Sequence, residues 1–563
     1  MVSSWAVRFR RRVFAGIRWA LWWACPLGVM GVLVVLAAHV AWRYGWWPTS
    51  TLNWTVISII TILVTRPVHR RIFKARNRRL TDIPRTLAKA DDPFARFRGE
   101  TIRSGGGAFL GWMRSPQGAR LWRSASSEAA VLVLAPPRAG KTTGIIIPSV
   151  LAAPAAVVVT STKRDVLDAT VLARTIRGTC WLFDPSGHET IPPGVQRVRW
   201  SPIASATTWD SARLVARSMI GASISTARST DTSGSGAHFA DKASDLLAPL
   251  LYAARQASYT AGDVADWLYT QDLATAAHIL DGLEHDETHS AGARIGNTTL
   301  ASILNLDERE RSGVWSTAQR VMSAYQSTAA RELATEVNFD PATFAAGADT
   351  LYVTASDEIQ AQNTPIVVGL LTAIKEAVYN AHRFGQQPWP LTMLLDETAN
   401  IAPIEDLPRW LSTAGGNGLH LVIVLQDLSQ AALRWGRDVA SGLLTLCNTK
   451  IVLGGIGDLN TLRSLSAVIG TYDRQVATQS TSQPRKQFGM RRPAVTVSQS
   501  ISTVRTPILS ESQIAQLPQG TILMIEGPRY GYLELAHFHD QQGAPWLTAI
   551  QTIPSRTSLQ NVK

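Results

Sequence analysis

Cysteine is scarce in this sequence of 563 residues. Only Cys25, Cys180 and Cys447 occur, and they are far apart with no C-x-x-C pair. Neither a disulfide framework nor a structural zinc site is therefore indicated. This scarcity favours a cytoplasmic location for the soluble part of the chain.

Charged residues are also few, at 17% of the chain, whereas hydrophobic residues make up 45%. Over a length that exceeds one ordinary core, this composition predicts a folded protein of two or three domains. The net charge of +13 favours a polyanionic partner or an anionic membrane surface. Net charge alone does not distinguish these two partners.

Two stretches near the N-terminus lack formal charge. Residues 20–42 are rich in Leu, Val, Ala and Trp, and they are long enough to cross about 30 Å of hydrocarbon as a helix. Residues 46–65 are a weaker candidate, because their first half is polar. Arginines precede the first stretch, Arg and Lys follow the second, and Arg43 is the single basic residue between them. The positive-inside rule then places both ends in the cytoplasm and predicts a transmembrane helical hairpin. A hydrophobic helix pair within a soluble protein is the alternative.

A phosphate-binding loop is predicted after the apolar run at 131–134. The sequence from Ala135 to Thr142, APPRAGKT, fits the pattern GxxxxGK[ST] except that Ala135 replaces the first glycine, and a helical segment follows. Backbone N–H groups of such a loop cradle phosphates, Lys141 would reach the β and γ oxygens, and Thr142 would bind Mg²⁺. The predicted ATP-binding residues are Ala135, Pro136, Pro137, Arg138, Ala139, Gly140, Lys141, Thr142 and Thr143.

An acidic pair follows a second apolar run. Residues 391–395 read as a buried parallel strand that delivers Asp396 and Glu397 at its carboxyl end, where ligands bind in such sheets. We expect Asp396 to hold Mg²⁺ through water and Glu397 to polarise the attacking water. An ordinary strand ending in a solvated acidic turn is the alternative.

The pattern along the chain predicts an α/β protein with an interrupted core. Strands are expected at 131–134, 155–160, 180–183, 350–354, 391–396, 419–425, 449–453 and 521–525, mostly separated by helices. The predicted domains are an anchor at 1–80, a linker at 81–125, the ATPase core at 126–204 and 336–545, an inserted all-α domain at 205–335 and a tail at 546–563. Residues 473–503, rich in Gln, Ser, Thr and Arg, are expected to form a mobile excursion. It either contacts DNA phosphates through Arg485, Lys486, Arg491 and Arg492 or is a solvated loop.

Several segments resemble the type IV coupling proteins, the TraG/TraD-like ATPases of conjugative DNA transfer. They are residues 135–151, 394–401 (LLDETANI) and 411–430 (LSTAGGNGLHLVIVLQDLSQ). The resemblance implies a RecA-like P-loop ATPase core, a hexamer and an N-terminal anchor in the plasma (inner) membrane, with the N-terminus and ATPase domain cytoplasmic. It also implies that ATP and Mg²⁺ drive transfer of relaxase-bound single-stranded DNA into a secretion channel. Gln426, which ends a third strand, would sense the γ-phosphate.

One departure from that family leaves alternatives open. Family members often carry an arginine in the loop before the glutamine strand, but residues 414–417 contain none. Either Arg409, Arg320 or another arginine acts in trans, or charge stabilisation in trans is weak. A membrane receptor with little ATPase activity is therefore an alternative, as is a double-stranded DNA translocase of the chromosome-partitioning type. No LSGGQ-like signature lies between Lys141 and Asp396, which argues against an ABC-transporter ATPase.

Overall fold

The computed structural model describes residues 101, 103–114, 120–227, 235–354, 360–482 and 496–535. Among these residues no helix combines the length and the apolar character that a membrane span needs. The two spans expected at 20–42 and 46–65, and the tail expected at 546–563, lie outside the described residues.

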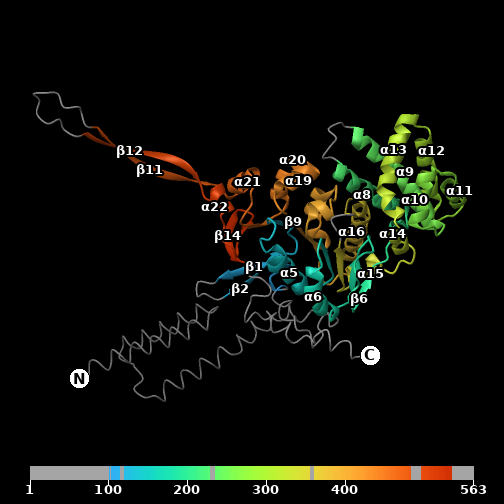
Figure 1. The fold of residues 1–563 in the computed structure, drawn as a ribbon, viewed down its shortest axis with the longest axis horizontal. Coiled ribbons are helices and arrows are strands. Elements are labelled where there is room, and N and C mark those ends of the chain that lie inside the picture. Colours follow the sequence, from blue (N-terminus) through green and yellow to red (C-terminus); the bar gives the residue numbers. More distant parts are fainter. Residues whose placement is uncertain are drawn as a thin grey trace, which may run out of the picture. The chain divides into compact units, whose positions relative to one another are not determined.

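A twelve-stranded sheet forms the centre of the described chain (Figure 1). Eight neighbouring strands are parallel, and four antiparallel strands extend the sheet beyond β10. The α/β class with a large, mainly parallel sheet is thereby confirmed. The order is β2 (Arg120–Ser126), β1 (Gly106–Arg114), β14 (Arg529–Glu534), β13 (Thr521–Glu526), β10 (Thr449–Leu453), β3 (Val131–Leu134), β9 (Leu419–Leu425), β8 (Leu391–Leu395), β4 (Val157–Ser161), β7 (Thr350–Thr354), β5 (Cys180–Phe183) and β6 (Val195–Arg197).

Both faces of the sheet are covered, which explains why its central strands are continuous apolar runs. In β3, Val131 and Val133 point into one core and Leu132 and Leu134 into the other. The first core contains residues of η2 (Thr142–Ile146), α5 (Ile147–Ala152) and α6 (Asp165–Thr175). The second contains residues of α16 (Gln360–Arg383), α18 (Leu407–Thr413), α19 (Leu428–Trp435), α20 (Arg437–Leu446) and α21 (Leu459–Ile469).

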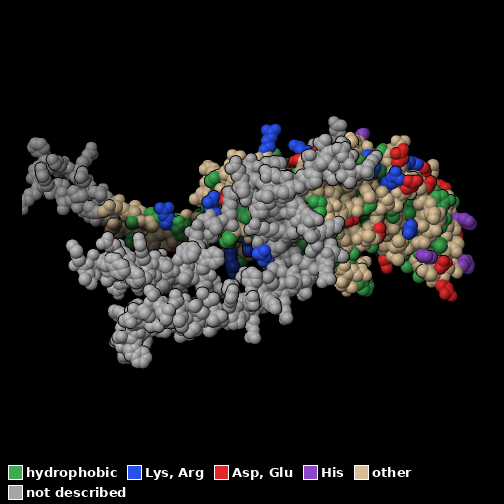
Figure 2. Space-filling model, turned by 90° about the horizontal axis from the view of Figure 1, so that it is seen from below, with side chains coloured by type: hydrophobic (Ala, Val, Ile, Leu, Met, Phe, Trp, Pro, Cys, Tyr) green, Lys and Arg blue, Asp and Glu red, His purple; other side chains and the backbone are tan. Residues whose placement is uncertain are grey.

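Between β6 and β7 the described chain contains only helices. They are α7 (Pro202–Ser205), α8 (Trp209–Ala227), α9 (Ser235–Gln256), α10 (Ala261–Thr270), α11 (Ala274–Leu283), α12 (Ser290–Leu304), α13 (Glu308–Met322), η3 (Ser323–Gln326), α14 (Thr328–Leu333) and α15 (Pro341–Ala346). Residues 205–335 hold fifteen acidic and ten basic side chains, so the positive net charge comes from the rest of the chain. Figure 2 shows acidic and histidine side chains gathered at one end of this helical region.

Two expectations along the chain need correction. The linker expected over 81–125 is wrong in its second half, because β1 and β2 pair within the main sheet. Glycines in β1 and arginines in β2 hide the apolar alternation that signals a strand. The excursion expected over 473–503 is largely an antiparallel ribbon of β11 (Thr471–Ser482) and β12 (Thr496–Pro507), and its residues 483–495 lie outside the described ones.

His420 ties the central strand β9 to β1 and to the residue that follows β2. The Ala108 N–H donates to His420 Nε2 at 2.9 Å, and His420 Nδ1 lies 3.2 Å from the Ser127 carbonyl oxygen. The imidazole is fully buried. Burial lowers the pKa of His420 to about 4, although the backbone hydrogen bonds of its ring act in the opposite direction.

Acidification is therefore expected to destabilise the protein through His420. Its folded pKa is lower than its unfolded pKa, so the unfolded chain binds the extra proton and stability falls as the pH drops from about 6.5 to about 4. Across this pH range, protonation of His420 lowers the free energy of unfolding by about 3 kcal/mol in total. Urea titrations at pH 7.5 and pH 5 should show a smaller difference in the midpoint for His420→Gln than for the parent. An equal pH dependence in both proteins would remove His420 as a cause.

Candidate nucleotide-binding and hydrolysis site

The predicted phosphate loop starts at the centre of the sheet. β3 lies between β9 and β10, and the Ala135 N–H donates to the Leu425 carbonyl oxygen at 3.0 Å. Ala135 is buried and does not take a positive φ, so its methyl group causes no backbone strain at the first glycine position. Arg138 and Gly140 have φ values of 63° and 91°, which turn the loop back toward the helix start. The Gly144 N–H then bonds to the Gly140 carbonyl oxygen at 2.9 Å and begins η2.

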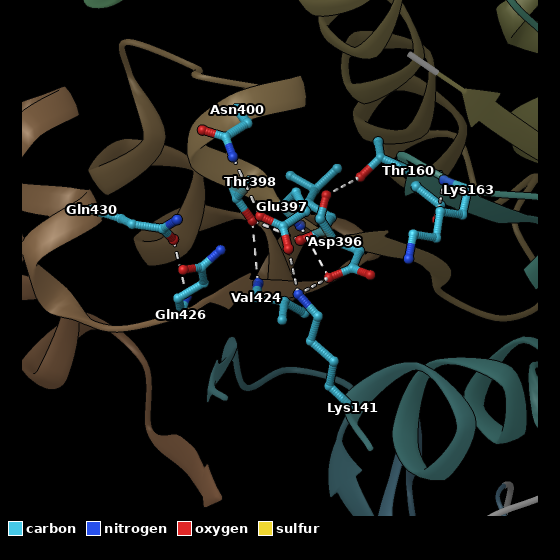
Figure 3. A network of polar contacts seen from close by, with 12 residues as sticks. Lys141, Thr160, Lys163, Asp396, Glu397, Thr398, Asn400, Val424, Gln426 and Gln430 are labelled. Carbon is cyan, nitrogen blue, oxygen red and sulfur yellow. Dashed lines mark hydrogen bonds and ion pairs between the residues drawn. The ribbon is translucent and has the colours of Figure 1, made fainter. Parts of the chain in front are cut away.

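The structure brings Lys141, Asp396 and Glu397 together (Figure 3). Lys141 Nζ lies 3.0 Å from Asp396 Oδ1 and 2.5 Å from Glu397 Oε1. Burial alone would lower the pKa of Lys141, but the two carboxylates outweigh it and raise that pKa above its usual value. Burial raises the pKa of Asp396 despite the nearby ammonium group. One lysine thus faces two acids at the start of a helix, a combination of groups that fits a phosphate with its Mg²⁺.

The backbone holds the acidic pair in an uncommon conformation. Glu397 has a φ of 52° and a ψ of 45°, the left-handed region that a residue with a side chain rarely adopts. Its N–H donates to Asp396 Oδ1 at 3.0 Å, and Asn400 Nδ2 donates to Glu397 Oε2 at 3.3 Å. This geometry fixes the Glu397 carboxylate beside Lys141.

Two threonines connect this strand end to its neighbours, and sequence reasoning missed both. The Thr160 hydroxyl donates to the Asp396 carbonyl oxygen at 2.8 Å. Thr398 Oγ1 donates to the Leu395 carbonyl oxygen at 2.6 Å and accepts from the Val424 N–H at 3.2 Å. Both are buried hydroxyls that follow apolar runs, which is the signal that would have found them. They link β8 to β4 and β9.

Gln426 directly follows the carbonyl group that binds the start of the phosphate loop. Its own N–H donates to Oε1 of Gln430, a residue of α19, at 2.9 Å (Figure 3). This hydrogen bond connects α19 to the end of β9. Because Gln426 is the next residue after Leu425, a movement of the loop would also displace Gln426.

The candidate trans-acting arginines lie elsewhere on the chain. Arg409 is exposed on α18, and Arg320 is exposed on α13 of the helical region. The loop that carries an arginine in other family members forms the short turn η4 (Gly415–Asn417) here, at the amino end of β9. Because the strands from β10 to β6 are parallel, that end is opposite the edge where the phosphate loop lies.

The family model described as Type IV secretory system Conjugative DNA transfer matches residues 94–543. No curated protein matches the chain.

Among the solved structures similar to this chain are several forms of the conjugative coupling protein TrwB. Its unbound form lacking the N-terminal segment (TrwBdeltaN70) has a TM-score of 0.55 and 14% identity, over 80% of this chain and 93% of that one. Its complex with ADP and Mg²⁺ has a TM-score of 0.53 and 14% identity, over 78% and 91%. Its complex with the ATP analogue ADPNP has a TM-score of 0.54 and 14% identity, over 80% of this chain and 93% of that one. At this identity the matches show a common fold, and together with the family model they establish the assignment: the chain belongs to the conjugative DNA transfer family of type IV secretory systems.

Proposed function

We propose that the protein is a membrane-anchored, ATP-driven DNA translocase that passes relaxase-bound single-stranded DNA to a type IV secretion channel. The observation that carries this proposal is the contact of Lys141 with both Asp396 and Glu397 at the start of a phosphate loop. The bound nucleotides and Mg²⁺ of TrwB support ATP and Mg²⁺ as ligands here.

ATP binding requires an exchange of partners at Lys141. Its ammonium group would leave the Asp396 carboxylate and bind the β and γ oxygens, while the N–H groups of residues 138–142 surround the phosphates. Mg²⁺, held by Thr142 and Asp396, would supply the charge that neutralises the phosphates. Glu397, released from the lysine, would then accept a proton from the attacking water.

The remaining assignments follow the family resemblance. Gln426 would sense the γ-phosphate, and residues 135–143 would form the ATP site of a RecA-like core. Residues 1–80 would anchor the protein in the inner membrane as a multi-pass hairpin, with the N-terminus and ATPase domain cytoplasmic. Six copies would surround the DNA. The acidic helical region makes the basic remainder of the chain the better candidate for contact with phosphates.

DNA binding tests the proposal. Full-length protein in detergent should bind single-stranded DNA without sequence preference, because the contacts are made to phosphates. The logarithm of the binding constant should fall linearly with the logarithm of the salt concentration, with a slope of about −0.7 for each phosphate contacted. Single-stranded DNA should also raise the ATPase rate.

Two outcomes would favour other functions. A protein with neither DNA binding nor DNA-stimulated hydrolysis at low salt would be a recruiting receptor, an alternative that the arginine-free turn at 414–417 supports. A preference for duplex DNA in both assays would indicate a double-stranded DNA translocase.

A further inference from the structure

The β11–β12 ribbon pairs twelve residues of each strand, from Thr471 opposite Pro507 to Ser482 opposite Thr496. It leaves the rest of the protein beside α21 and α22 (Glu511–Ala515) in Figure 1. At its root the Ile508 N–H donates to the Gly470 carbonyl oxygen at 3.0 Å, and the Ser466 hydroxyl donates to the Leu509 carbonyl oxygen at 2.6 Å. One hydrogen bond therefore joins the residue before the ribbon to the residue after it.

The ribbon exposes large apolar side chains on both faces. Ile501 is 71% exposed on one face, and Tyr472, Val476 and Val504 are 49%, 36% and 47% exposed on the other. A two-stranded sheet that packs on nothing is marginally stable in water. We therefore expect this surface to be covered in the working assembly.

The chemistry of the two strands favours a protein as the covering surface. Asp473 lies opposite Arg505, so Arg474 is the remaining charge of β11 and β12. Strand edges that must avoid other proteins usually carry Lys or Pro, yet within the two strands the only such residue is Pro507 at the root. A nucleic-acid surface would instead require a row of basic side chains, and the four basic residues at 485, 486, 491 and 492 belong to the segment between the two strands.

The size of the ribbon fits a specific protein contact. Twelve residues per strand span about 40 Å, and two strands are about 10 Å wide, so each face offers on the order of 400 Å². Both faces together supply about 800 Å², the area that one partner contributes to a standard interface.

The helix that follows the ribbon is hydrogen bonded to a residue near the phosphate loop. The Gly455 N–H donates to the carbonyl oxygen of Ala515, the last residue of α22, at 2.9 Å. A Cβ atom added to Gly455 would lie 3.4 Å from Cγ of Pro136. Gly455 therefore lies between Pro136 of the phosphate loop and α22, the helix that follows the ribbon.

We propose that the β11–β12 ribbon docks on a second copy of this chain and links subunit assembly to the state of the nucleotide site. The inference rests on the proposed function, which needs several subunits around DNA. The acceptor is a protein surface of the neighbouring copy, and the ribbon contributes its apolar side chains to the contact.

Excision of the ribbon tests this role. Because Gly470 and Ile508 are hydrogen bonded, residues 471–507 can be replaced by an Asn-Gly turn that leaves α21 and α22 in place. Full-length parent protein in detergent should form multi-subunit species with an ATP analogue in sedimentation experiments, and the excised protein should need at least about 10-fold more protein to do so. The excised protein should bind the analogue within twofold of the parent. Equal assembly of the two proteins, or a parent that stays monomeric, overturns the proposal.

A double point variant tests the same role without depending on whether the excised protein folds. Tyr472→Ser combined with Ile501→Ser changes only exposed side chains and should weaken assembly in the same direction. Normal assembly of this variant together with lost DNA binding would assign the ribbon to nucleic acid and overturn the proposal. The ATPase rate of the parent is a separate measurement, so failure of the proposed function is recognised independently.

Photo-cross-linking identifies the partner directly. A benzophenone amino acid at position 501 should cross-link to a second copy of the chain in the presence of the ATP analogue. The matched control is position 384, where Phe384 is 70% exposed at the end of α16. Cross-linking between copies that is no greater at 501 than at 384 contradicts the proposal.

Discussion

Replacing Glu397 by Gln is expected to lower the rate of ATP hydrolysis by about 100-fold or more while ATP binding is retained. The amide keeps the size of the side chain but cannot accept a proton from water. Lys141 would also lose one of its two anionic partners and become easier to transfer to phosphate. Single-turnover hydrolysis and fluorescent nucleotide binding, measured on the same full-length protein, separate the two effects.

Two further variants make that measurement decisive. Lys141→Ala should weaken binding and turnover together, because the lysine binds phosphate in the ground state. Glu376→Gln is the matched control, since Glu376 pairs with Lys375 at 2.6 Å outside the site and should leave the rate within about twofold of the parent. Unchanged turnover in Glu397→Gln would remove this residue from the mechanism.

Arg174→Met is expected to destabilise the protein by about 3–5 kcal/mol. The guanidinium group is buried, and it donates to the carbonyl oxygens of Ala153, Ala155 and Ala348 at 2.9–3.1 Å. It also donates to Thr350 Oγ1 at 2.6 Å. Burial lowers the pKa of Arg174, yet an arginine stays charged in proteins, so the methionine would leave several buried acceptors without a donor.

The neighbouring Arg177 supplies the control. It donates to the Pro154 carbonyl oxygen at 3.0 Å from a half-buried position, so Arg177→Met should cost about 1 kcal/mol. Urea midpoints give the loss of stability, and hydrogen exchange in β4 and β7 should show where it occurs. An Arg174→Met protein as stable as Arg177→Met would mean that water replaces the lost donors.

The sequence predicted the parallel part of the sheet well because these strands are buried on both faces. In β3 and β9 the apolar residues run without interruption, and both strands were expected with the observed bounds. The short parallel strand β6, with the sequence VQR, was not expected. Of the antiparallel strands, β13 was expected at 521–525, whereas β1, β2 and β14 were not. β14 has exposed Tyr530 and Tyr532 beside buried Leu533, a mixed pattern that a turn-rich loop also produces.

The site was predicted as a set of residues but not as a network. Spacing located Lys141, Asp396 and Glu397, since a phosphate loop and a strand-end acid pair have recognisable patterns. Their mutual ion pairs could not be read from the sequence, because the two segments are 256 residues apart. The link from Gly455 to Pro136 was equally invisible, since it depends on β10 being the parallel neighbour of β3.

The order of strands in the large sheet also constrains how the protein is made. β1 and β2 are synthesised early, yet β1 pairs with β14, and β13 pairs with β10, so the antiparallel end closes only when residues 521–534 arrive. About 400 residues separate β2 from β13, which at ribosomal rates of 5–20 residues per second is roughly 20–80 s of synthesis. During that time one edge of β1 lacks its final partner and is open to pairing with other chains, and one edge of β10 is open from its own synthesis until β13 arrives. A nascent or C-terminally truncated chain should therefore depend on chaperones far more than the finished protein does.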